Sequence, residues 1–496
     1  MKTAHHHHNW EPVIGLEIHA ELNTRSKLFS SAPNHFGDEP NRNITEVCTG
    51  MPGALPVLNK EAVRKAVQFG LAVGARVATF SQFDRKSYFY PDSPRNFQIT
   101  QYAHPIILGG SVMVVVGDEE KAFPINRAHL EDDAGMLKHF SDFATVDYNR
   151  AGVPLLEIVS EPCMHTAKEA ALYAMAVKAI LDYIDASDCN MQEGSLRIDV
   201  NVSVRKKGEA GFRNKIEIKN MNSFSNLEKA VAHEITRQIS AYEQYPDKDP
   251  QDVIQQSTYR WDPDKGQTVL MRRKEYADDY RYFPEPDLLP LILTPEYIEE
   301  IRKTLPELPY EREKRYISKL QLGPQQAFTL VSDKQIAAYF EEALQDCTYA
   351  KTLANWIIVE FPGRLKELGK TLPETPIQPS HIASLVNMIE TGIISGKIAK
   401  SVADDMVARM TAPNNLPLDP GAIVEANPEY LPITNRETIL PIVEAVVAAN
   451  AQSVADFIAG RDRALAFLVG QVMKQTKGSA SPQVVNELLM ECIKKK

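Results

Sequence analysis

The sequence lacks the features that would tie the chain to a membrane, a disulfide framework or a zinc motif. No apolar run approaches the roughly 20 residues that a membrane-spanning helix needs. Cysteine is rare and odd in number, five in 496 residues, and no two cysteines stand in C-x-x-C spacing. These absences predict a folded cytoplasmic protein with reduced thiols.

The chain also lacks an excess of positive charge, because its 65 acidic residues outnumber its 55 lysines and arginines. The formal net charge is -10, whereas affinity for phosphate backbones depends on dense lysine and arginine. The composition therefore argues against a generally basic nucleic-acid binder. A nucleic-acid partner would have to be bound by a local patch, by shape, or with the help of another chain.

The chain is long enough for several domains. Its first 290 residues mix alternating strands with a few helices, whereas the residues after Pro295 have helical periodicity with proline-rich breaks at 373–379 and 413–420. We expect an α+β fold class: a mixed sheet and helix catalytic domain, an all-helical domain and a small helical tail domain. The expected segments are 1–9, a histidine-rich tag or disordered leader, then 10–293, 294–411 and 412–496.

Residues 13–22 predict a strand with two different faces. Apolar side chains at positions 14, 16, 18 and 20 alternate with Glu17, His19 and Glu21. A carboxylate and an imidazole two residues apart on a strand project in parallel, which suits a shared metal ion or proton. The alternative is a half-buried strand with a solvated outer face, and this interpretation is kept for Glu21.

Other segments have equally clear periodicity. Residues 195–205 and 215–219 predict an antiparallel hairpin, and residues 60–77 and 166–186 predict helices. The segment 84–102, with two prolines and several aromatic residues, predicts a loop that carries function.

Carboxylates in unusual surroundings mark the candidate chemistry. Glu157 lies inside an otherwise apolar strand-like run, where a charge is costly to bury unless it is paired or bound to metal. Convergence of Glu17, His19, Glu157 and either Glu131 or Asp132 would make an oxygen-rich site for Mg²⁺ or Mn²⁺.

Basic side chains would complete such a site by neutralising phosphate oxygens. The candidates are Lys86, Arg150, Arg197 and Lys219. The alternative is an ion-pair network that holds the sheet together. No G-x-S-x-G motif is present, so the sequence offers no amidase nucleophile of that kind.

Long motifs, read together, resemble the B-subunit family of the tRNA-dependent Asp/Glu amidotransferases, the GatB family. The tail run QVMKQTKGSASPQVVNELL resembles that family's tail domain, which small YqeY-like proteins share. The resemblance covers nearly the whole chain, in order. The remaining motifs are IGLEIHAEL, MPGALPVLN, DRKSYFYPDSPRNFQITQY, INRAHLEDDAG, DYNRAGVPLLEIVSEP, MQEGSLRIDVNVSVR and EIKNMNSF.

The resemblance implies one chain of a three-chain ligase. In that family the B subunit uses ATP and Mg²⁺ to phosphorylate the carboxylate of Glu or Asp carried on mischarged tRNA(Gln) or tRNA(Asn). The amidase A subunit supplies ammonia from glutamine, and a small C subunit wraps the contact between the other two chains. Helical and tail domains are expected to bind the tRNA by shape and backbone.

Site residues follow from the same resemblance, position by position. Glu17, His19, Glu131 and Glu157 match the metal-site motifs, with Asp132 as a competitor for Glu131. Further motif positions are expected around the nucleotide and the acceptor end of tRNA: the four basic residues named above, with Tyr88, Tyr90, Ser195 and Asn220.

A structural zinc site, which many family members hold on four cysteines, is not expected. The corresponding positions here are Ser30, Ala32, Thr45 and Cys48. Three alternatives to a catalytic chain of this family stay open. They are a non-catalytic tRNA-binding scaffold, a stand-alone metal hydrolase, and the archaeal-type relative that carries an inserted domain.

Overall fold

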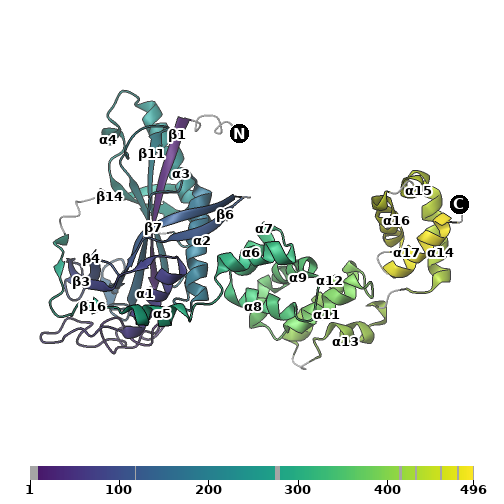
Figure 1. Cartoon of the computed structure of the whole chain (residues 1–496), viewed down its shortest axis with the longest axis horizontal. Coiled ribbons are helices and arrows are strands. Elements are labelled where there is room, and N and C mark those ends of the chain that lie inside the picture. Colours follow the sequence, from purple (N-terminus) through teal and green to yellow (C-terminus); the bar gives the residue numbers. More distant parts are fainter. Residues whose placement is uncertain are drawn as a thin grey trace. The chain divides into compact units, whose positions relative to one another are not determined.

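The computed structural model describes residues 9–117, 119–219, 221–273, 280–412, 416–430, 433–458, 461–476 and 480–494. The chain forms two compact units, Met1–Arg312 and Glu313–Lys496 (Figure 1). The sheets lie in the first unit and the second is helical, so the expected α+β class is confirmed in these terms. The boundaries expected at 293/294 and 411/412 stay predictions.

A ten-stranded sheet is the centre of the first unit. Its order is β14-β13-β12-β11-β1-β10-β7-β5-β2, with β6 also paired to β7, and among the described strands of this sheet only β12 and β13 run parallel. The strands are β1 Trp10–Glu21, β2 Arg76–Val77, β5 Ile107–Leu108, β6 Ser111–Val116, β7 Glu119–Asp132, β10 Pro154–Ser160, β11 Leu196–Lys206, β12 Ile216–Lys219, β13 Ser257–Asp262 and β14 Gln267–Arg273.

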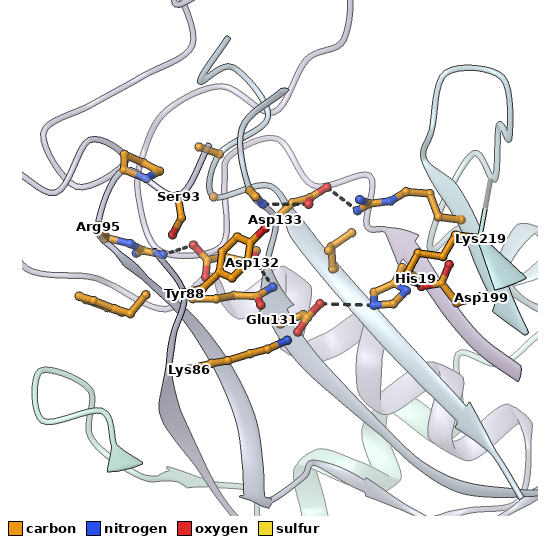
Figure 2. Close-up of a pocket in the computed structure, with 18 of the residues that line it drawn as sticks. His19, Lys86, Tyr88, Ser93, Arg95, Glu131, Asp132, Asp133, Asp199 and Lys219 are labelled. Atoms are coloured by element: carbon orange, nitrogen blue, oxygen red, sulfur yellow. Dashed lines mark hydrogen bonds and ion pairs between the residues drawn. The ribbon is translucent and has the colours of Figure 1, made fainter. Parts of the chain in front are cut away.

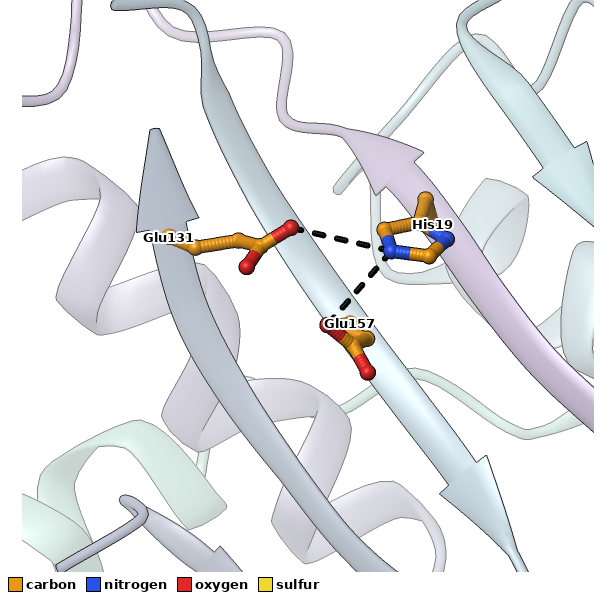
Figure 3. A group of neighbouring side chains, drawn as sticks. All are labelled: His19, Glu131 and Glu157. Atoms are coloured by element: carbon orange, nitrogen blue, oxygen red, sulfur yellow. Dashed lines mark ion pairs between the residues drawn. The ribbon is translucent and has the colours of Figure 1, made fainter. Parts of the chain in front are cut away.

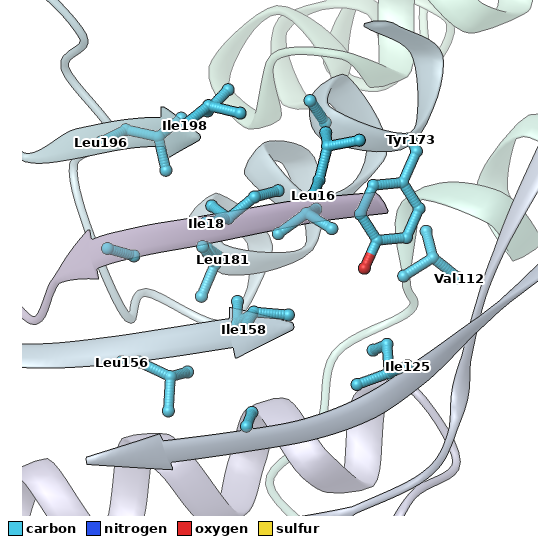
Figure 4. Packing of buried hydrophobic residues seen from close by; sticks show 14 of the residues in the cluster. Leu16, Ile18, Val112, Ile125, Leu156, Ile158, Tyr173, Leu181, Leu196 and Ile198 are labelled. Atoms are coloured by element: carbon cyan, nitrogen blue, oxygen red, sulfur yellow. The ribbon is translucent and has the colours of Figure 1, made fainter. Parts of the chain in front are cut away.

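Strand β1 follows the predicted alternation. Ile14, Ile18 and Ala20 are fully buried and Leu16 is nearly so, and this face packs against helices. Figure 4 shows Leu16 and Ile18 beside Tyr173 and Leu181 of the helix α2. The helices of this layer are α1 Lys60–Ala72, α2 Ala167–Tyr183 and α3 Phe224–Gln244.

Each of these helices begins at a side-chain cap. Asn59 and Ser223 accept backbone N–H groups at the starts of α1 and α3, and Thr166 forms a capping box with Glu169 at the start of α2. The helix predicted over 60–77 ends earlier, at Ala72. Gly74 then adopts a φ of 64°, which turns the chain into β2.

A smaller sheet corrects the loop predicted over 84–102. Strands β3 Phe80–Ser87 and β4 Phe97–His104 pair antiparallel, and only the residues between them form a loop. Arg85 lies opposite Ile99, and Lys86 lies opposite Gln98. The prediction was wrong because aromatic and charged residues obscure the alternation within this segment. Its strands are defined by backbone pairing with each other and with distant segments, which the local pattern does not reveal. The same sheet holds β15 Phe283–Pro284 and β16 Leu291–Ile292, and β8 Met136–His139 pairs separately with β9 Ala144–Asp147.

The second unit is built from short helices around two separate apolar cores. Among the described residues, no single helix is long and apolar enough to cross a membrane, and α14 with α15 meets that test only as a pair bent by 88°. The remaining helices of the chain are α4 Pro250–Val253, α5 Pro295–Arg302, α6 Pro309–Leu320, α7 Pro324–Val331, α8 Lys334–Ala343, α9 Ala350–Asn355, α10 Phe361–Leu365, α11 Pro379–Glu390, α12 Gly396–Thr411, α13 Pro420–Ala426, α14 Arg436–Ala449, α15 Ala451–Ile458, α16 Asp462–Gln475 and α17 Pro482–Lys494.

Candidate functional site

The candidate site lies on the face of the large sheet opposite the helices, where three strands align polar residues in one row. Glu157 of β10 pairs with His19 of β1 on one side and with His129 of β7 on the other. Glu131 stands two residues beyond His129 and therefore projects from the same face of β7. Residues far apart in the sequence are thus brought together by strand register.

Three of these side chains form a group that fits a cation. The Nε2 atom of His19 lies 3.6 Å from Glu131 Oε1 and 3.4 Å from Glu157 Oε2 (Figure 3). Ligand atoms of the three residues all lie within 4.8 Å of one another. One imidazole nitrogen and two carboxylates are a donor set for Mg²⁺ or Mn²⁺.

The group is largely shielded from water, and this shapes its protonation. Burial opposes the imidazolium form of His19, but the hydrogen bond and charge of Glu157, with the charge of Glu131, raise its pKa to about 9. Burial likewise opposes ionisation of Glu157, yet the neighbouring His129 and His19 hold the pKa of this carboxyl well below its usual range. The protonated His19 places a positive charge beside the two buried carboxylates.

A cavity of about 540 Å³ opens beside the group (Figure 2). His19 and Glu131 belong to its wall, together with four basic side chains. Arg95 pairs with Asp132, Arg197 with Asp133, and Lys219 with Asp199. The remaining basic side chain on this wall is Lys86.

Lys86 reaches the cavity from β3 and lies close to the carboxylates. Its Nζ atom is 5.0 Å from the centre of the Tyr280 ring. Burial disfavours the ammonium form, but the charge of Glu131, with smaller effects of Tyr282 and Glu157, raises the pKa of Lys86 above its usual range. Lys86 therefore stays cationic beside the candidate cation group.

The structure brings together three of the four metal ligands expected from the sequence. Glu17 lies outside the group, and its Oε1 accepts a hydrogen bond from Asn201 Nδ2 at 2.9 Å. Asp132, the competitor of Glu131, is bound to Arg95 and accepts the Ile99 N–H at 2.8 Å. Glu131 is thus the member of that pair that faces His19.

Of the expected residues Tyr88, Tyr90 and Arg150, only Tyr88 is among the residues that line the cavity. Tyr88 lines the cavity and stacks on Tyr90, with ring centres 5.7 Å apart, but Tyr90 is half exposed. Arg150 donates to the carbonyls of Ala134 and Gly135, on the chain that follows β7.

Ser195 is engaged within its own loop. Its Oγ donates to Asp188 and accepts the Asn190 N–H at 2.8 Å. The predicted residue Asn220 lies outside the described residues.

Sequence reasoning assigned no role to two residues of the site. Arg95 follows a proline in the loop between β3 and β4, and it is identified by its ion pair with Asp132 and its place on the cavity wall. His129 belongs to the motif that supplied Glu131, yet its contact with Glu157 depends on a strand register that the sequence does not reveal.

Glu21 corrects a further expectation. Alternation alone predicts a solvated residue without a partner, but Glu21 is only partly exposed and lies close to Asp133. Burial, with the nearby Asp133 charge, raises the pKa of Glu21 to about 8.

The four positions that correspond to a zinc site in the resembling family do not fit a structural zinc. Ser30 Oγ and Thr45 Oγ1 lie 3.2 Å and 3.5 Å from Cys48 Sγ, and Ala32 offers no ligand atom. A single thiol with two hydroxyls is not the thiolate and imidazole set that such sites use.

Comparisons with known proteins agree with the motifs over almost the whole chain. A model described as the GatB/GatE catalytic domain matches residues 12–299, and one described as the GatB domain matches residues 338–493. The chain belongs to the GatB family. The resemblance found in the sequence is therefore confirmed.

Curated relatives in the GatB family are similar over their full length. The B subunit of an aspartyl/glutamyl-tRNA(Asn/Gln) amidotransferase from Protochlamydia amoebophila is 67% identical over 487 residues, 98% of this chain and 97% of its own. The protein of the same name from Chlamydia muridarum is 58% identical over 488 residues, 98% of this chain and 99% of its own. The protein of the same name from Chlamydia caviae is 59% identical over 482 residues, which are 97% of this chain and 98% of its own.

Proposed function

We propose that this GatB-family chain activates the carboxylate of Glu or Asp carried on mischarged tRNA(Gln) or tRNA(Asn), using ATP. The carboxylate is then amidated with ammonia from a partner chain, which makes the complex a carbon–nitrogen ligase of the cytoplasm. The observation that carries the proposal is the group His19, Glu131 and Glu157, of which His19 and Glu131 line a cavity that also holds four basic side chains.

The donor set supports a divalent cation, Mg²⁺ or Mn²⁺, on His19, Glu131 and Glu157. When bound, such an ion would supply positive charge against phosphate oxygens. Glu17 would join the ligands only after its side chain leaves Asn201. The zinc positions do not fit that metal, so the proposal includes no structural zinc.

Phosphoryl transfer requires positioning and charge neutralisation more than covalent help from the protein. In the first step a carboxylate oxygen of the tRNA-borne residue bonds to the γ-phosphorus, and the bond from that phosphorus to ADP breaks. Lys86, Arg95, Arg197 and Lys219 surround the space and would hold the phosphate oxygens.

Amide formation completes the proposed reaction. Ammonia bonds to the carbonyl carbon of the acyl phosphate, the bond to the phosphate oxygen breaks, and inorganic phosphate and a proton leave. The chain has no G-x-S-x-G motif, which is consistent with ammonia coming from an amidase A subunit acting on glutamine. The relatives are named as B subunits, and this supports assembly with partner chains. The partners proposed are that amidase A subunit and a small C subunit.

A tRNA-binding scaffold without catalytic groups is the second candidate function. The acidic composition leaves recognition to shape and local contacts, which either function would use. The two candidates differ in whether the cation group is needed for ATP turnover.

The test compares ATP hydrolysis by the reconstituted complex with and without Glu-tRNA(Gln). We expect Glu157→Gln and His19→Ala to lose at least about 100-fold of the tRNA-dependent turnover, because they remove cation ligands. Glu161→Gln is the matched control, since Glu161 lies four residues away and bonds to Asn126 instead. Full tRNA-dependent turnover in Glu157→Gln would favour the scaffold.

A further inference from the structure

His129 occupies a place that mirrors that of His19. Both histidines lie directly opposite Glu157 in the strand register, one on each neighbouring strand. His129 Nε2 is 3.3 Å from Glu157 Oε2, and His19 Nε2 is 3.4 Å from the same oxygen. Glu157 is therefore held between two imidazoles.

The two histidines differ in their relation to the cation group. His129 Nε2 is 3.9 Å from Glu131 Oε2, and His129 lies outside the set whose ligand atoms are all within 4.8 Å of one another. The distances from His129 Nε2 to Glu157 and Glu131 are short, so what sets His129 apart is that it does not belong to the set that includes His19. This geometry favours a role for His129 behind the ligands rather than among them.

The position of the ring proton follows from burial. His129 is 4% exposed, and its Nδ1 has no hydrogen-bond partner in the described structure. A buried N–H without an acceptor costs more than an unfilled nitrogen lone pair. The proton is therefore assigned to Nε2, which faces the carboxylate of Glu157.

We propose that His129 is a positioning residue of the cation site. Its Nε2–H holds Glu157 from the β7 side and fixes the carboxylate in the orientation that meets His19 and Glu131. Partners behind metal ligands of this kind typically change metal affinity by about 10-fold to 100-fold when they are removed. The inference rests on the proposed cation site and adds the residue that orients one of its ligands.

The test measures Mn²⁺ binding to the full chain by electron paramagnetic resonance of free and bound Mn²⁺. Glu157→Gln gives the background, which includes any Mn²⁺ held by the four consecutive histidines at positions 5–8. We expect His129→Leu to weaken binding above that background by about 10-fold to 100-fold. His129→Gln should stay within about threefold of the parent chain, because a glutamine amide can donate to Glu157 from the same side.

A matched control separates positioning from general damage. His233 lies on α3, in the helical layer, where its ring contacts Trp261 and Thr268. His233→Leu should leave Mn²⁺ affinity unchanged.

Four outcomes are decisive. Rescue by His129→Gln together with loss in His129→Leu supports the inference, and a folded His129→Leu chain with parental Mn²⁺ affinity overturns it. If His129→Leu does not fold, equal weakening by His129→Gln and His233→Leu overturns it instead. Binding by the parent chain no tighter than by Glu157→Gln would refute the proposed cation site itself, and the inference with it.

Discussion

The two faces of strand β1 meet different environments although their residues alternate in the chain. Leu16 and Ile18 point into a helix-covered core and are at most 1% exposed. His19 directly follows Ile18, points to the opposite face and contacts two carboxylates. One face of the strand therefore contributes to stability and the other to the candidate cation site. Substitutions on the first face should change the free energy of unfolding, and those on the second should change cation binding.

The largest expected effect is on the apolar face. Leu16→Ala removes a buried side chain and should lower the free energy of unfolding by about 2–5 kcal/mol. Urea denaturation followed by hydrogen exchange of peptides from the first unit would measure it. Leu289→Ala, at a leucine that is 90% exposed, is the control and should change the value by less than about 0.5 kcal/mol. Equal effects of the two changes would contradict the assignment of the core.

The polar face should respond to cations instead. At a Mn²⁺ concentration about 100 times the dissociation constant, the parent chain should gain about 2.7 kcal/mol of stability. His19→Ala should lose most of this gain, whereas Leu16→Ala should keep it once its own destabilisation is subtracted. The measurement is urea denaturation with and without Mn²⁺, and an undiminished gain in His19→Ala would show that the ion binds elsewhere.

Two thiols of the first unit lie in different environments, one on the cavity wall and one against the apolar core. Cys48 is on the cavity wall, where burial opposes ionisation but Ser30, Thr45 and the charge of Lys27 lower its thiol pKa. Cys163 packs against the apolar core, and burial raises its pKa to about 11. Near pH 7.5 we expect iodoacetamide to label Cys48 about tenfold faster, since the larger thiolate fraction outweighs its lower nucleophilicity.

The labelling rates of the two thiols should depend on pH in different ways. The Cys163 rate should keep rising with pH toward about 11, while the Cys48 rate should level off below the usual thiol range. Peptide mass spectrometry reads both sites in one sample, with Cys48→Ser as the control. Cys163 is the more exposed of the two thiols. Faster labelling of Cys163 at pH 7.5 would therefore mean that solvent access, and not the thiolate fraction, determines the labelling rate.

The smallest expected effect concerns the helical layer behind β1. Thr166→Ala removes the capping box of α2 and should cost about 1 kcal/mol of unfolding free energy. Mn²⁺ affinity should not change, because α2 packs on the apolar face. Thr236→Ala, on an exposed part of α3, serves as the control, and a loss of Mn²⁺ affinity in Thr166→Ala would break the separation of the two faces.

Local periodicity predicted much of this fold. The strand around His19, the hairpin of β11 with β12 and the helix α2 all follow from alternation or helical spacing, because these patterns report which face a residue occupies. The segment 84–102 did not follow, since β3 and β4 are defined by pairing with each other and with β15 and β16.

Candidate ligands were predictable as residue types in conspicuous motifs, and His19, Glu131 and Glu157 come together in the structure. Their exact partners were not. The register of β1 with β10 and of β10 with β7 decides that His129 faces Glu157, and periodicity within one strand carries no information on register between strands. The same holds for Glu21, whose partner Asp133 lies over 100 positions away.

The proposed activation of a tRNA-borne carboxylate by phosphorylation can be tested by following one oxygen atom. The reconstituted complex is given ATP, glutamine and Glu-tRNA(Gln) whose side-chain carboxylate carries ¹⁸O in both positions. If the carboxylate is phosphorylated, each inorganic phosphate released with amidated product should carry one ¹⁸O from the carboxylate. Amidated product accompanied by unlabelled phosphate would contradict this proposal.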